Sequence, residues 1–220
     1  MPDMDVAASI QLIAAAIIPV IFAVTLHEVS HGLMARHCGD RTAELQGRLS
    51  LNPLKHIDPV GSVAVPLVLT FLSLPPFGWA KPVPVNSRNL RRPKRDMVLV
   101  AVAGPASNFA MALFWTVVFA VGLRSSASVF GARQFLISMA QYGITFNVLL
   151  AIFNLLPIPP LDGGRVVRGL VPEGVGRALD KVEPYGLILV IGLLSLQVLG
   201  PVLGPAVNFV SRWFFAAAGV

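Results

Sequence analysis

Three residues, His27, Glu28 and His31, form the most informative chemical pattern in the sequence, within His27-Glu28-Val29-Ser30-His31. On a helix, residues four positions apart lie one turn apart on the same face, so both imidazoles would reach one metal ion. Glu28 would lie beside that face with its carboxylate free. This spacing is typical of zinc-dependent hydrolases, in which a metal ion and a general base together activate water.

A catalytic zinc site of this type needs a third protein ligand, and Asp162 is the candidate. Asp162 follows a stretch with three prolines, Asn154-Leu-Leu-Pro-Ile-Pro-Pro-Leu-Asp162, which cannot form a regular helix. Gly163 and Gly164 come next and permit close approach of the backbone. The alternative is that Asp162 only caps a helix that begins near Gly163. We favour the ligand interpretation.

Glu28 is the candidate general base, which would take a proton from the attacking water and pass it to the leaving amine. The alternative is an ion pair with a nearby arginine such as Arg36. Asn108 and Asn154 lie within or at the ends of apolar segments, and either could donate to the oxyanion of a tetrahedral intermediate or orient the substrate. For each asparagine, a hydrogen bond between helices is an equally good interpretation.

The composition is that of an integral membrane protein. The chain is 55% hydrophobic and 13% charged, with a mean hydropathy of +0.74, whereas about a quarter of the residues of soluble domains are charged. The net charge of +6 does not indicate nucleic acid as a partner, because the basic residues cluster in short loops between apolar runs. The single cysteine, Cys38, excludes an internal disulfide and a cysteine-rich zinc cluster.

The apolar pattern predicts an all-α polytopic membrane protein with five or six hydrophobic segments in one domain, residues 1–220. The predicted segments are 6–37, 60–77, 97–123, 135–156 and 185–220, the last broken into two spans at Gly200-Pro201 or Gly204-Pro205. Segment 60–77 is short and closed by two prolines, which favours a re-entrant or paired element. Because the histidines fall near the end of segment 6–37, the metal would lie inside the membrane, away from its centre. The N-terminus lacks a basic signal region, so we expect this segment to be retained.

Two polar stretches near this site are expected to be extended. Residues 44–52 alternate as a strand does, and the prolines in 78–86 exclude a helix. We expect short re-entrant, β-like elements there that pair with an unwound substrate. The loops on either side of segment 60–77 are basic, which favours a cytoplasmic position for both. His37 and His56 lie in or beside the first loop and are interpreted as solvated or interfacial.

Three motifs together resemble the site-2 protease family of intramembrane zinc metalloproteases. They are HEVSHG at the end of a span, Gly104-Pro-Ala-Ser-Asn108 in a middle span, and Asn154 followed by Leu161-Asp162-Gly163-Gly164. The resemblance implies one zinc ion held by His27, His31 and Asp162, with Glu28 as the base. It implies cleavage of transmembrane protein substrates within the lipid bilayer. It also implies an active site reached from the cytoplasmic side, which agrees with the charge pattern of the loops. A chain of 220 residues has no room for PDZ or CBS domains, so it resembles the minimal form in a prokaryotic inner membrane.

Other functional classes share some of these features. A membrane zinc-binding or transport protein also carries intramembrane His and Asp. A non-proteolytic scaffold could bind transmembrane helices, and a hydrolase could act on a small lipid-soluble substrate. Replacement of Glu28 by Gln separates these alternatives, because only a hydrolase depends on a free carboxylate beside the metal.

Overall fold

The computed structural model describes residues 6–72, 78–125 and 132–219, and within these ranges every regular element is helical. The elements are α1 (Val6–His37), α2 (Thr42–Leu45), the 3-10 turn η1 (Pro53–His56), the π-helical turn η2 (Pro59–Ala64), α3 (Val65–Phe71), η3 (Ser87–Asn89), α4 (Pro93–Arg124), α5 (Ala132–Asn154), α6 (Asp162–Leu170), α7 (Glu173–Val182), η4 (Glu183–Tyr185), α8 (Gly186–Ser195) and α9 (Gly200–Ala218).

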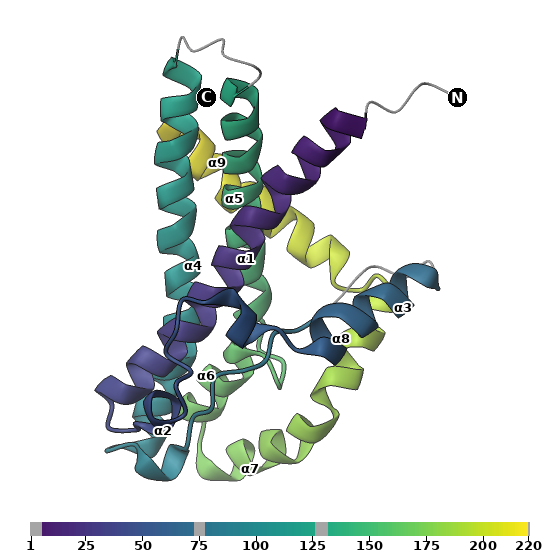
Figure 1. Cartoon of the computed structure of the whole chain (residues 1–220). Coiled ribbons are helices and arrows are strands. Elements are labelled where there is room, and N and C mark those ends of the chain that lie inside the picture. Colours follow the sequence, from purple (N-terminus) through teal and green to yellow (C-terminus); the bar gives the residue numbers. More distant parts are fainter. Residues whose placement is uncertain (1–5, 73–77, 126–131, 220) are drawn as a thin grey trace.

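Three long helices form the body of the molecule. Helices α4 and α5 run side by side, α1 crosses them, and α9 packs against both α4 and α5 (Figure 1). The core between α4, α5 and α9 is built from apolar side chains that include Trp115, Phe119, Ile144 and Val148. Many outward-facing apolar side chains of the long helices are exposed, which suits contact with lipid.

The long predicted segments are confirmed as helices able to cross a bilayer. The apolar spans are Ile13–His37, Pro93–Arg124 and Ala132–Asn154, the shortest of which has 23 residues, enough for a core of about 30 Å at about 1.5 Å per residue. Three such helices in the described part of the chain indicate a multi-pass membrane protein.

The predicted total of five or six spans is not confirmed. Segment 60–77 is a helix only over Pro59–Phe71, which is too short to cross the membrane, and residues 73–77 lie outside the described ranges. Helix α8 has only ten residues, and α9 is bent by 84° from the helical stretch Glu173–Ser195, which ends with α8. The break falls just before Gly200, close to the predicted position, because Pro201 fits only the first turn of a helix. This bent pair adds at most one span to the three.

The predicted β-like elements are not confirmed either, since no strand occurs among the residues that the structure describes. Stretch 44–52 begins inside α2, which follows a turn in which the buried Asp40 carboxylate accepts hydrogen bonds from the backbone and hydroxyl of Thr42. Residues 78–86 are not helical but form no ladder, because Pro82 and Pro84 carry no N–H.

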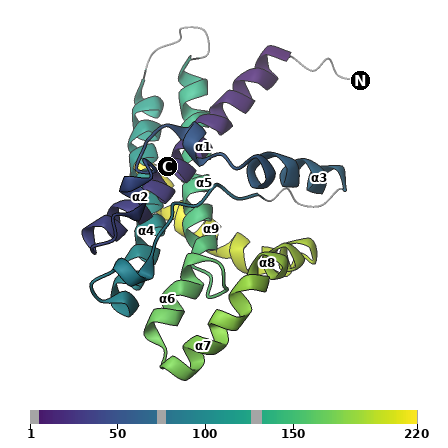
Figure 2. The same cartoon turned by 60° about the horizontal axis from the view of Figure 1, so that its bottom comes forward.

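The short helices lie beside the bundle. Helices α3 and α8 extend from the same side of the molecule, and α6 and α7 lie at the end where α1 finishes and α4 begins (Figure 2). The segment that joins η1 to the start of α4 is tied to this end through Asp40, which also accepts from the Asn86 backbone and the Asn89 side chain. These hydrogen bonds hold the residues around Asn86 and Asn89 next to the C-terminal end of α1.

Candidate metal centre

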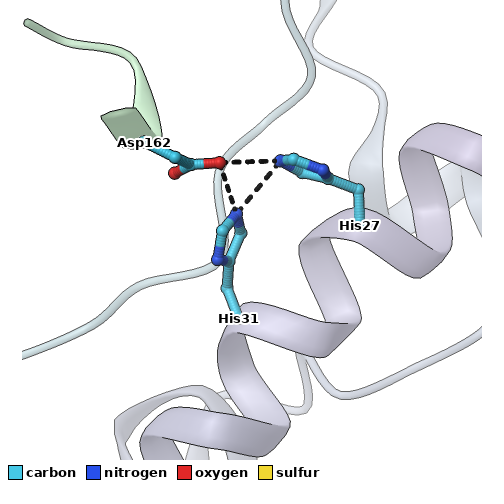
Figure 3. A group of neighbouring side chains, drawn as sticks. All are labelled: His27, His31 and Asp162. Carbon is cyan, nitrogen blue, oxygen red and sulfur yellow. Dashed lines mark hydrogen bonds and ion pairs between the residues drawn. The ribbon is translucent and has the colours of Figure 1, made fainter. Parts of the chain in front are cut away.

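The structure brings His27, His31 and Asp162 together in one buried group (Figure 3). The two histidines lie one turn apart on α1, and Asp162 is the first residue of α6. Asp162 Oδ2 is 3.2 Å from His27 Nε2 and 3.3 Å from His31 Nε2, and the two Nε2 atoms are 3.0 Å apart. All three residues are at most 7% exposed. Asp162 thus joins two histidines that precede it by more than 130 positions in the sequence, through the contact between α1 and the start of α6.

The hydrogen bonds on the far side of each ring fix where its proton lies. His27 Nδ1 is 2.7 Å from Asn108 Oδ1, and His31 Nδ1 is 2.7 Å from the Val100 carbonyl oxygen. Both partners are acceptors, so each Nδ1 carries a hydrogen and donates, and in the neutral form of each ring the lone pair lies on Nε2. Asp162 Oδ2 is buried without a hydrogen-bond donor in the described chain. Three lone pairs therefore converge, an arrangement that is unfavourable unless a cation lies among them.

The spacing of these atoms fits a zinc ion. Ligand atoms about 2.0–2.1 Å from a tetrahedral centre lie about 3.3–3.4 Å from one another, close to the separations of 3.0, 3.2 and 3.3 Å between the three atoms. Two imidazoles and one carboxylate also match the ligand set of catalytic zinc sites, which leave a fourth position open. The donor set fits zinc in both geometry and chemistry.

Gly104 on α4 makes room for the two imidazoles. A Cβ atom on this residue would lie 2.4 Å from His31 Nε2 and 2.7 Å from His27 Cε1, so any larger residue would displace a ring. The absence of a side chain at Gly104 thus lets α4 approach the two imidazoles closely.

A tightly packed turn positions Asp162. A Cβ on Gly163 would lie 2.2 Å from the Leu155 carbonyl oxygen, and one on Gly164 would lie 2.7 Å from the Pro159 nitrogen, so the start of α6 packs directly against the backbone of residues 155–159. Asp162 does not cap the helix, because Leu161 occupies the cap position and no side chain bonds there. The carboxylate instead points toward the histidines (Figure 3).

Glu28 is half-buried, and its carboxylate Oε2 accepts a hydrogen bond of 2.8 Å from the Val83 backbone N–H. The alternative partner, Arg36, forms an ion pair with Glu44 instead, at 3.2 Å. The predicted base is therefore held by a backbone amide from residues 78–86 and not neutralised by an arginine. No side-chain pattern in the sequence could have indicated this contact.

The structure places the two predicted oxyanion donors differently. Asn108 is fully buried, and its amide donates to the Ala23 carbonyl and to Asn147 Oδ1 while its oxygen accepts from His27. Both of its hydrogens are engaged, which favours the interhelical alternative over an oxyanion role. Asn154 is half-buried at the end of α5 and donates to the Leu150 carbonyl within its own helix. Its role at the oxyanion stays a prediction.

The two remaining histidines lie outside the cluster. His37 is exposed, as predicted for a solvated residue. His56 is only 3% exposed, so its interpretation as solvated is wrong. His56 Nε2 is 2.8 Å from the Ser50 carbonyl oxygen, and the Lys81 backbone N–H donates to the His56 carbonyl. These contacts hold His56 within the loop.

A cavity of about 720 Å³, lined by both charged and apolar side chains, opens between the residues next to Val83 and helix α6. One wall is the Pro82–Val85 stretch, which includes the amide that holds Glu28, and another is α6, where Arg165 lies one turn beyond Asp162. Lys94, Glu173 and Asp180 also line it. The cavity thus reaches the residue whose backbone amide binds the proposed base.

Comparisons with known proteins identify a family of zinc metalloproteases. The sequence model of peptidase family M50 matches residues 15–198. "Putative zinc metalloprotease YwhC" of Bacillus subtilis is 41% identical over 197 residues, 87% of this chain and 85% of that protein. "Putative zinc metalloprotease Rip2" of Mycolicibacterium smegmatis is 33% identical over 191 residues, 86% of this chain and 66% of that protein. No solved structure gives a significant match. The chain therefore belongs to peptidase family M50, the site-2 protease family of zinc metalloproteases.

Proposed function

We propose that this chain is an intramembrane zinc metalloprotease that hydrolyses peptide bonds within or near the transmembrane helices of other proteins. The observation that carries the proposal is the convergence of the three buried ligand atoms of His27, His31 and Asp162 at distances that suit one zinc ion. Membership of family M50 supports metallopeptidase chemistry, and the apolar helices support a membrane setting.

Each side chain of the centre has a distinct role in this proposal. His27, His31 and Asp162 hold the metal. Zinc bound there would polarise the scissile carbonyl and make the attacking water more acidic. Glu28 takes the proton of that water and delivers it to the leaving amine, since it lies beside the histidines without a cationic partner among the described residues. The Val83 amide orients the carboxylate for both transfers.

The substrate must present an unwound stretch, because a helix hides its carbonyls in hydrogen bonds. Residues 78–86 run past the base without forming a ladder, and they suit pairing with such a stretch. Pro82 and Pro84 have carbonyls but no N–H, so at these positions the segment can only accept hydrogen bonds from a substrate. The cavity beside Val83, lined by charged and apolar side chains, gives the unwound segment and water a place next to the proposed base.

The distribution of charge supports an active site that opens to the cytoplasm of a prokaryotic cell. Basic residues crowd the end of the molecule where α1 finishes and α4 begins, and α6 carries more of them. They include Arg36, Arg91, Arg92, Lys94 and Arg165. We propose that residues 1–220 form one membrane-embedded protease domain with this end inside the cell.

Cleavage of single-span test proteins by the purified chain in liposomes tests the proposal. The expected result is cleavage that a zinc chelator abolishes and that Glu28→Gln lowers by at least about 100-fold while the bound zinc is unchanged. Gln keeps an oxygen that accepts from the Val83 amide, so this variant removes the base and little else. A transporter or scaffold would bind zinc without cleaving any of the single-span test proteins. Cleavage at the wild-type rate by Glu28→Gln would overturn the assigned base.

A further inference from the structure

Two buried asparagines link three helices to one ligand of the proposed zinc. Asn147 on α5 and Asn108 on α4 are both 0% exposed. Asn108 Nδ2 donates to Asn147 Oδ1 at 3.0 Å, and Asn108 Oδ1 accepts from His27 Nδ1 at 2.7 Å. A continuous chain of hydrogen bonds therefore runs from α5 through α4 to a metal ligand on α1.

The donor and acceptor in each of these hydrogen bonds are determined by the backbone carbonyls that Asn147 and Asn108 also contact. Asn147 Nδ2 donates to the Gly143 carbonyl at 2.8 Å, so its oxygen faces Asn108 and must accept. The second hydrogen of Asn108 Nδ2 goes to the Ala23 carbonyl on α1 at 3.2 Å. With both hydrogens committed, Asn108 can present only its oxygen to His27. His27 therefore carries its hydrogen on Nδ1 and its lone pair on Nε2, as a metal ligand requires.

Asn147 does not contact the centre itself. Its contacts are the Gly143 carbonyl in its own helix and the amide of Asn108. A buried amide in an apolar helix interior is unfavourable unless its groups are satisfied, and a leucine would pack there without that requirement. Asn147 is therefore placed to orient Asn108, and through it the ring of His27.

We propose that Asn147 is a positioning residue of the metal centre, which fixes the orientation of Asn108 and thereby the tautomer and ring position of His27. The inference rests on the proposed function, because it assumes that His27 binds zinc. It also implies that the packing of α5 against α4 and α1 acts on zinc affinity, so a displacement of α5 would loosen the metal.

Zinc affinity measured by chelator competition on the purified full chain in detergent tests this inference. Removal of a group that orients a metal ligand costs about 10- to 100-fold in affinity. We expect Asn108→Leu to fall in this range, and Asn147→Leu to lose about 10-fold, at its lower end. Thr116→Val is the matched control, because Thr116 is buried on α4 but donates only to Ala112 in its own helix. It should keep wild-type affinity.

The double variant distinguishes a relay from two independent packing effects. If Asn147 acts through Asn108, the Asn108→Leu/Asn147→Leu protein has the affinity of Asn108→Leu alone. Losses that multiply, or an Asn147→Leu protein within twofold of wild type, would overturn the relay. Asn147→Ser removes the same contact with less change in volume, and it carries the test if the leucine variant does not fold. A wild-type chain that binds no zinc would overturn the metal centre itself, a result distinct from the failure of the relay alone.

Discussion

Gly104→Ala is the smallest change that should disrupt the metal centre without altering a ligand. The added Cβ would lie 2.4 Å from His31 Nε2 and 2.7 Å from His27 Cε1. Carbon atoms prefer separations of about 3.5–4.0 Å, so a ring must move by about 1 Å. The rings cannot move freely, because the Val100 carbonyl and the Asn108 amide hold their Nδ1 atoms at 2.7 Å.

The size of the effect follows from this displacement. Zinc–ligand distances tolerate changes of only about 0.2 Å, so a ring that has moved by about 1 Å no longer binds the metal in the same position. Overpacking of a tight site costs about 1–3 kcal/mol, which corresponds to a loss of zinc affinity of about 5- to 150-fold. Peptidase activity at limiting zinc should fall by the same factor.

Chelator competition on the purified variant gives this affinity directly. The matched control is Gly204→Ala on α9, where an added Cβ meets no atom within 4 Å. The control should bind zinc as the wild type does. An unchanged zinc affinity for Gly104→Ala, with the fold intact, would refute the assignment of the two imidazoles as ligands held against α4.

Further substitutions probe the base, the third ligand and the loop around the site. Val83→Pro removes the N–H that binds Glu28, so kcat should fall about 10-fold or more through loss of a hydrogen bond to a charged group; Val83→Ala, which keeps the amide, should cost much less. Asp162→Asn should abolish stoichiometric zinc binding measured by metal analysis, because a neutral amide is a poor zinc ligand. Burial raises the pKa of Asp40, but hydrogen bonds from neighbouring hydroxyl and amide groups outweigh it and hold this pKa below its ordinary value. Its stabilising effect is therefore present above about pH 4 and is lost as the pH falls through the lowered pKa. As the pH is lowered, the melting temperature of the metal-free protein should fall more steeply in the wild type than in Asp40→Asn. Parallel curves of melting temperature against pH would contradict the stabilising role of the ionised Asp40 carboxylate.

The sequence predicts the long helices and the local part of the site well. Segments of about 23 residues or more without interruption are unambiguous, because a bilayer requires that length and little else imitates it. The histidine pair was predictable because residues four apart share a helix face. Asp162 was found from its glycines and prolines, which mark a backbone that must approach something closely.

The remaining features depend on partners that no local pattern reveals. The Val83 amide and the Val100 carbonyl are backbone groups, so the side chains at these positions carry no trace of what they bind. Asn147 was visible as an amide in an apolar segment, but its partner on α4 depends on how the helices pack. The expected strand in residues 78–86 is not confirmed, because amides there bond to the Glu28 side chain and to other residues of the chain.

X-ray absorption at the zinc edge on the purified, metal-loaded chain reports the ligands of the bound metal. We expect one zinc per chain, with two imidazole nitrogens and carboxylate or water oxygens at about 2.0–2.2 Å and no sulfur. Asp162→Asn should lose this signature, and Gly104→Ala should show it only at higher zinc concentrations than the wild type. A chain that retains no zinc, or a zinc bound by the sulfur of Cys38, would contradict the metal centre formed by His27, His31 and Asp162.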